Sequence, residues 1–141
     1  TATGTNATAT GQGARATASN SIAMGSGSVA NQASTASFGT PGNERRLTNV
    51  AAGTDDTDAA NVKQLRQVRE GVAMAMAMGG AGLPEKKRFA VGLNYGYFDR
   101  QSAIAIASHL RINDNFVASA GVGFGLEMNQ IGARAGVQFT W

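Results

Sequence analysis

The last 53 residues, from Phe89 to Trp141, read as four consecutive short strands in which large apolar residues occupy every second position. In the first of these strands, Val91 and Leu93 lie on one face and Gly92 lies on the other. Such alternation over about ten residues, with polar turns between the segments, is typical of strands that cross an outer membrane. A soluble antiparallel sheet with one face on a core is the alternative interpretation.

The two faces of these strands have different compositions, and we expect different surroundings for them. Residues of the apolar face are expected to face lipid: Phe89, Val91, Leu93, Tyr95, Tyr97, Ile104, Ile106, Leu110, Phe116, Val122, Phe124, Val137 and Phe139. Small residues of the opposite face are expected to line a lumen: Gly92, Gly96, Gly121, Gly123, Gly125, Gly132 and Gly136. A face of such small residues predicts that another element packs closely against it.

Four strands leave two edges whose backbone groups have no partner, and each such group costs several kcal/mol in hydrocarbon. Closure therefore needs strands from further copies of the chain. Two copies would give eight strands, whose interior is filled by side chains alone. Three copies would give twelve strands and room for helices inside, so the pattern favours a trimer without excluding other stoichiometries.

A helix is predicted from Ala59 to Met78, with Thr57 or Asp58 as its N-cap and a glycine-rich stop at residues 79–84. Its core-forming residues follow a heptad seam, which would pack copies of the helix together. The seam consists of Val62, Leu65, Arg69, Val72 and Met76. Arg69 interrupts the apolar seam, and we interpret it as a registry device or as a site for an anion or water between chains.

The first 40 residues repeat with a period of 14, as the spacing of Gly11, Gly25 and Gly39 shows. A fixed short period with glycines at the corners predicts a solenoid of strands and turns. Each coil has few large residues, so we expect the solenoid to pack against copies of itself. A disordered linker rich in alanine, glycine, serine and threonine is the alternative.

These patterns divide the chain into four parts: head repeats at 1–42, a neck at 43–58, a helix at 59–82 that combines coiled coil and pore-threading segment, and a membrane anchor at 83–141. The fold class is therefore mixed β and α. Because the first residue is Thr rather than Met, we expect a mature product or the C-terminal part of a longer chain.

Composition argues against enzymatic, metal-binding and nucleic-acid-binding functions. The chain has no cysteine and a single histidine, His109, which the strand phase directs into a crowded lumen, so we interpret it as structural. Asp55, Asp56 and Asp58 lack the spacing of a calcium loop, and helix capping explains them. The net charge of +3 comes from scattered bases without interleaved aromatic residues, unlike a nucleic-acid surface. We expect no cofactor.

Several motifs, in this order, resemble the C-terminal portion of the YadA-like trimeric autotransporter adhesins. Residues 21–25 (SIAMG) and their repeats resemble the head, and residues 47–54 (LTNVAAGT) with 58–65 (DAANVKQL) are similar to the neck. Residues 101–105 (QSAIA) and 137–141 (VQFTW) resemble the membrane anchor. The chain departs from the family in one respect, because it lacks a long stalk between neck and anchor.

The resemblance implies a homotrimer in the outer membrane of a Gram-negative bacterium, in which three chains share one twelve-stranded barrel with helices threaded through its pore. It implies that the anchor exports the passenger and that the exposed head attaches to host matrix or cells. It also implies that Trp141 is the terminal signal read by the outer-membrane insertion machinery. A transport pore with a helical plug and a soluble trimeric fibre tip are the alternative functions.

Overall fold

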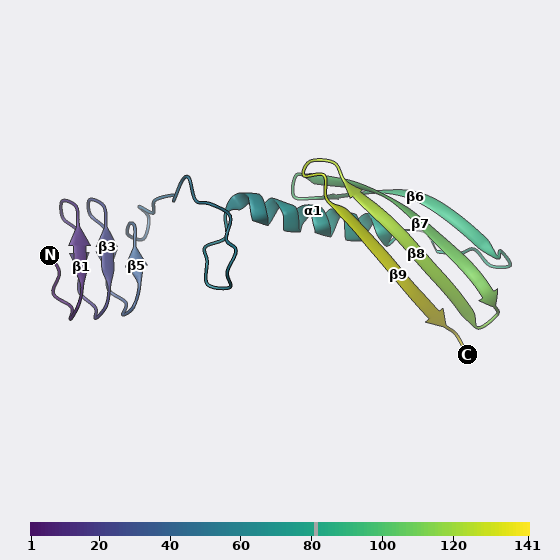
Figure 1. The fold of residues 1–141 in the computed structure, drawn as a ribbon, viewed down its shortest axis with the longest axis horizontal. Coiled ribbons are helices and arrows are strands. Elements are labelled where there is room, and N and C mark those ends of the chain that lie inside the picture. The colour runs from purple at the N-terminus through teal and green to yellow at the C-terminus, as the bar shows by residue number, and fades with distance from the viewer. Residues whose placement is uncertain (81) are drawn as a thin grey trace. The chain divides into compact units, whose positions relative to one another are not determined.

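The computed structural model describes residues 1–80 and 82–141, which fall into two compact units, Thr1–Asn49 and Val50–Trp141. The first unit contains five short strands, and the second contains one helix and four long strands. The elements are labelled where there is room in Figure 1. The predicted helix stop passes through Ala81, which lies outside the described residues.

The first unit is a solenoid of short parallel strands. Its strands are β1 (Thr8–Thr10), β2 (Arg15–Ala16), β3 (Ile22–Met24), β4 (Val29–Ala30) and β5 (Ala36–Ser37). One sheet has the order β1-β3-β5 and the other pairs β2 with β4. Thr8 pairs with Ile22, and Ile22 pairs with Ala36, so neighbouring coils are offset by the 14 residues seen in the sequence.

The corners of the solenoid repeat in backbone conformation as well as in sequence. Asn6, Asn20 and Ser34 have φ values of 55°, 54° and 58° at the same corner of successive coils. Asparagine tolerates this left-handed region better than most residues. Gly11 and Gly25 also have positive φ, of 123° and 102°. The third glycine of the predicted series, at position 39, is not among the residues with positive φ.

The interior of the solenoid is built from alanine and serine. Ala16 and Ala23 are fully buried, and the hydroxyl of buried Ser28 donates to the carbonyl oxygen of Met24 at 2.7 Å. Ile22 and Met24 are the larger residues of their strand, and both are exposed. These outward-pointing side chains form a surface on which copies of the head could pack. That packing stays a prediction.

The second unit contains a four-stranded antiparallel sheet of order β6-β7-β8-β9. Its strands are β6 (Phe89–Phe98), β7 (Gln101–Asn113), β8 (Phe116–Gly125) and β9 (Ile131–Phe139). They lie where the alternation predicts them. The pairing is continuous from Phe98 opposite Gln101 to Phe116 opposite Phe139, apart from a register shift between Arg111 and Asn113.

The helix α1 spans Val62–Met78, which is three residues shorter at its start than the sequence predicts. Thr57 and Asp58 are not its N-cap. Asn61 is the N-cap, and its side chain accepts from the backbone N–H of Gln64 at 3.2 Å. The Gln64 side chain accepts in return from the backbone N–H of Asn61 at 3.1 Å. This reciprocal capping box satisfies two otherwise unpaired donors and fixes the helix start.

Replacing Asn61 with alanine should destabilise the first turn of α1 by about 1 kcal/mol, because the capping box is lost. We expect roughly fivefold faster amide hydrogen exchange at Leu65 and its neighbours, as that free energy implies. Asp56→Ala is the matched control, since Asp56 is exposed and no hydrogen bond of its side chain is seen among the described residues. Equal exchange in both variants would contradict the capping role.

Helix α1 lies along one face of the sheet, and Figure 1 shows it beneath β6–β9. Ala73, Met74 and Ala77 are the buried apolar residues of the helix, and the first two pack with fully buried Ala103 of β7. No described residue range covers the opposite face of the sheet, where Leu93, Ile106 and Val137 are exposed. The second unit therefore has a small core between helix and sheet and a large apolar exterior.

Candidate functional site

Glycines of the sheet allow the helix to approach the backbone of the strands. A Cβ on Gly96 of β6 would collide with the carbonyl oxygen of Ala73. A Cβ on Gly123 of β8 would lie 3.2 Å from the Cβ of Met74, and one on Gly132 of β9 would lie 3.5 Å from its sulfur. The small-residue face predicted from the sequence is thus the face that carries the helix.

The predicted lumen glycines differ in what they meet. Gly125, like Gly96, Gly123 and Gly132, lies against α1, since a Cβ there would overlap the Glu70 carboxylate. The remaining three are Gly92, Gly121 and Gly136, where an added Cβ would meet only residues of the sheet. Gly121 is nevertheless buried, whereas Gly92 and Gly136 are half-buried, so part of the small-residue face remains open.

The apolar face of the sheet is open. Leu93 is the most exposed residue of this face in β6, at 74%. Every residue expected to face lipid is exposed except Phe116, which is half-buried against Phe139 with ring centroids 4.9 Å apart. The structure thus places these residues on one continuous exterior, and their contact with lipid stays a prediction.

A second apolar surface runs along the side of α1 that the sheet does not cover. The seam residues Val62, Leu65, Val72 and Met76 are all exposed there. Val68 is 65% exposed and extends this stripe. The predicted heptad seam included Arg69 and did not include Val68. The packing of these residues against other helices stays a prediction.

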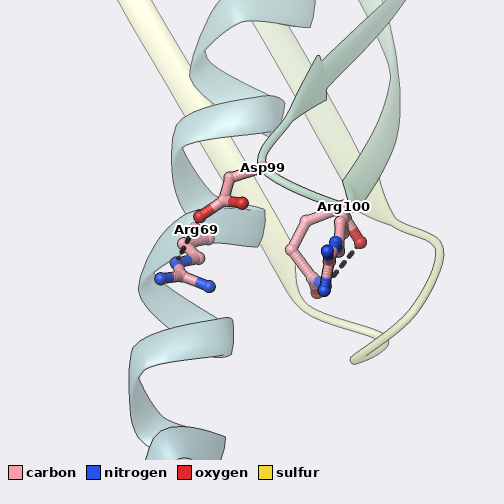
Figure 2. Close-up of polar contacts among 4 residues, drawn as sticks. Arg69, Asp99 and Arg100 are labelled. Atoms are coloured by element: carbon pink, nitrogen blue, oxygen red, sulfur yellow. Dashed lines mark hydrogen bonds and ion pairs between the residues drawn. The ribbon is translucent and has the colours of Figure 1, made fainter.

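Arg69 lies at the edge of the stripe and turns toward the β6–β7 turn. Its Nε is 3.0 Å from Oδ2 of Asp99, as Figure 2 shows. From the sequence, Arg69 was predicted to act between chains, and a carboxylate partner within the chain was not predicted. Both side chains are partly exposed, so this ion pair adds little stability but orients the turn relative to the helix.

Glu70, which the sequence reading missed, is fully buried and holds the loop between β8 and β9. Its Oε1 accepts from the backbone N–H groups of Glu127 at 2.8 Å and Met128 at 2.6 Å, and its Oε2 accepts from that of Gln130 at 3.1 Å. Hydrogen bonds to an ionised acceptor are roughly twice as strong as neutral ones. The available signal was that Glu70 is the sole acid of the helix sequence.

The far end of the helix meets Arg134 of β9, whose Nη1 is 3.5 Å from the carbonyl oxygen of Met78. A cation there complements the negative end of the helix dipole. His109 lines a small space beside Met78, Ser119 and Arg134. Among the described residues, no carboxylate lines this space.

The neck folds back onto the start of α1. The Gln64 side chain donates to the carbonyl oxygen of Gly53 at 2.9 Å and accepts from its N–H at 3.0 Å. The Asp58 carboxylate, expected to cap the helix, instead accepts from the N–H groups of Thr54 at 2.9 Å and Asp55 at 3.1 Å. These bonds, that from Thr54 first, hold the pKa of Asp58 below its ordinary 3.8.

This lowered pKa predicts an acid-sensitive neck turn. A carboxylate with a depressed pKa in the folded state stabilises that state above its unfolded pKa of 3.8, and the contribution is lost as the pH falls through the lower folded value. We expect amide exchange at Thr54 and Asp55, corrected for intrinsic pH dependence, to accelerate below that pH. Asp58→Asn should exchange quickly at every pH, and a pH-independent wild type would contradict the assignment.

Within the described residues no helix is long and apolar enough to cross a membrane. Over the same part of the chain, no group of three or more histidine, aspartate or glutamate side chains could hold a metal ion.

Comparison with protein families gives three matches along the chain. Residues 2–28 match two copies of the YadA head domain repeat, residues 46–76 match the coiled stalk of trimeric autotransporter adhesins, and residues 81–141 match the YadA-like membrane anchor domain. The stalk match spans parts of two predicted segments, the neck at 43–58 and the helix at 59–82.

Individual proteins that are similar to the chain include an adhesin and a membrane anchor. Neisseria adhesin A of Neisseria meningitidis serogroup B is 33% identical over 88 residues, which cover 61% of the chain and 24% of that protein. The chain thus matches about a quarter of the length of this curated relative. The solid-state NMR structure of the membrane anchor domain of the trimeric autotransporter YadA has a TM-score of 0.47 and 19% identity, covering 67% of the chain and 97% of that structure.

The chain combines a short parallel solenoid with a helix that packs on the small-residue face of a sheet. The other face of the sheet is apolar. This combination is that of a surface protein with a membrane anchor. With head, stalk and anchor matched in this order, the chain belongs to the family of YadA-like trimeric autotransporter adhesins. Its place is the outer membrane, with the head on the cell surface. Membership of an adhesin family points to a role other than catalysis.

Proposed function

We propose that three copies of the chain close one twelve-stranded barrel in the outer membrane, export the preceding part of the chain through it, and hold the head at the surface. The head then attaches to host matrix or host cells. In this proposal residues 1–42 are the head, 43–58 the neck, 59–82 the helix and 83–141 the anchor.

The observation that carries the proposal is a sheet with an apolar exterior and two open edges. Among the described strands, β6 pairs with β7 alone and β9 pairs with β8 alone, so each edge strand has one unpaired side. In hydrocarbon these backbone groups need partners, and joining β9 of one copy to β6 of the next would supply them all. The large exposed side chains of the exterior, such as Leu93, suit a lipid environment.

The helix surfaces support three helices inside such a barrel. One side of α1 packs on its own sheet through Ala73 and Met74, and the other side presents an apolar stripe that includes Leu65 and Val72. Three such stripes would pack together along a common axis, as in a coiled coil. Half-buried glycines such as Gly92 and Gly136 leave room for the helices of the other copies.

The partners that we propose are therefore two sister chains, outer-membrane lipid, the insertion machinery and a host ligand. Trp141 is fully exposed, so its side chain is accessible to that machinery. We infer that adhesion uses the repeated surfaces of several copies of the head, whose combined affinity exceeds that of one.

Ion conductance across a planar bilayer tests this function against a transport pore. With three helices in the lumen, the purified protein should produce almost no current. A deletion of residues 62–78 should conduct strongly if it still inserts, because the lumen loses its helices. Large currents from the intact protein would contradict the proposal and favour a pore with a movable plug.

A further inference from the structure

Two adjacent helix residues of opposite charge each hold a different turn at the same end of the sheet. Arg69 pairs with Asp99 in the β6–β7 turn, and Glu70 accepts three backbone hydrogen bonds from the β8–β9 loop. We propose that Glu70 is a positioning residue that fixes the depth at which the helix stops in the barrel. This inference rests on the proposed function, in which the chain moves outward through the barrel.

The loop is shaped to take a carboxylate. The N–H groups of Glu127, Met128 and Gln130 converge on the two oxygens of Glu70, and such concave sets of backbone donors favour anions. Gly125 precedes this loop, and any larger residue there would occupy the space of the Glu70 carboxylate. Loop and glycine therefore form a socket for one acidic side chain.

No other residue of the helix can present a carboxylate to this socket. Glu70 is the sole acid of α1, whose sequence carries bases at Lys63 and Arg66. One turn earlier in export the loop would face Arg66, a cation opposite N–H donors. One turn too far outward it would face Met74, which has no acceptor of comparable strength.

The neighbouring ion pair cannot define the depth by itself. Arg66 lies three residues before Arg69 and could approach Asp99 if the helix sat one turn deeper. The ion pair is also partly exposed, whereas Glu70 is fully buried. The Glu70 carboxylate thus distinguishes one depth of the helix from the next, and Arg69 orients the adjacent turn.

Disulfide cross-linking measures helix depth, because the chain has no cysteine of its own. A Cβ on Gly123 lies 3.2 Å from the Cβ of Met74, close to the roughly 3.8 Å of a disulfide. The full chain carrying Met74→Cys and Gly123→Cys is assembled in outer membranes, oxidised and analysed by peptide mass spectrometry. We expect efficient cross-linking, and a severalfold lower yield when Glu70→Ala is added. Adding Lys63→Gln, which changes the helix charge away from the socket, should leave the yield unchanged.

A relocated carboxylate separates depth control from general loss of stability. In the variant with Glu70→Cys and Gly123→Cys, adding Arg66→Glu should draw the helix one turn inward and raise the yield of that cross-link severalfold. This expected increase in yield tests the depth role even if the Glu70→Ala variant fails to assemble. If trimers form but neither cross-link yield changes, the depth role of Glu70 is wrong while the proposed function stands. If the unmodified chain forms no trimers, the proposed function itself fails.

Discussion

Replacing Gly96 with alanine is expected to destabilise each chain by about 3 kcal/mol, the upper part of the usual range for overpacking. The added Cβ would collide with the carbonyl oxygen of Ala73, and a backbone atom cannot rotate away as a side chain can. Helix and strand must then separate along their whole contact. Since the proposed assembly contains three such contacts, we expect its heat resistance in detergent to fall sharply.

The control for this prediction is Gly92→Ala on the same face of the same strand. There the nearest side-chain atom to an added Cβ is 3.6 Å away, which is an ordinary contact. Dissociation temperatures of the assembled protein are read from gels of unboiled samples heated in steps. A large loss with Gly96→Ala and little change with Gly92→Ala is expected, and equal dissociation temperatures would argue against the close helix–strand contact.

Replacing Ile106 with arginine is expected to cost about 2–4 kcal/mol per chain, the range for a cation on the lipid face near the middle of a membrane. Ile106 is exposed in the centre of β7, opposite Leu93 of β6. A charge there would have to leave water for hydrocarbon. We expect a strong decrease in the amount of protein inserted in the outer membrane, and an accumulation outside it.

Ile112→Arg is the matched variant for this second prediction. Ile112 is also exposed and also belongs to β7, but it lies at the strand end, where the same substitution costs about 0–1 kcal/mol. Membrane fractionation should therefore show a loss for the central variant alone. Normal insertion of the Ile106 variant would mean that this face does not contact lipid.

The strands were predictable from the sequence because their signal is local. Alternation of large and small residues repeats in every strand, and the structure places β6 to β9 where this pattern does. The parallel pairing of Thr8 with Ile22 likewise follows from a repeat that is visible in the sequence. The helix start was not predicted correctly, because several polar residues could serve as N-cap and the reciprocal bonds between Asn61 and Gln64 decide between them.

The contacts that fix the helix on the sheet could not be predicted in the same way. Glu70 binds backbone groups about 60 residues away, and backbone donors leave no mark in a sequence. Arg69 was interpreted as an interruption of a heptad seam. Its partner, Asp99, could not be predicted because it belongs to a turn whose position depends on the whole sheet. Long-range polar contacts of this kind are set by tertiary packing rather than by local pattern.

The native mass of the detergent-purified protein tests the closure of the barrel most directly. A band on an unboiled gel near three times the 14.4 kDa chain mass, which collapses to a single chain on harsh denaturation, is the expected result. Light scattering corrected for bound detergent should give the same stoichiometry. A single chain in water without affinity for micelles would contradict a barrel closed by sister copies.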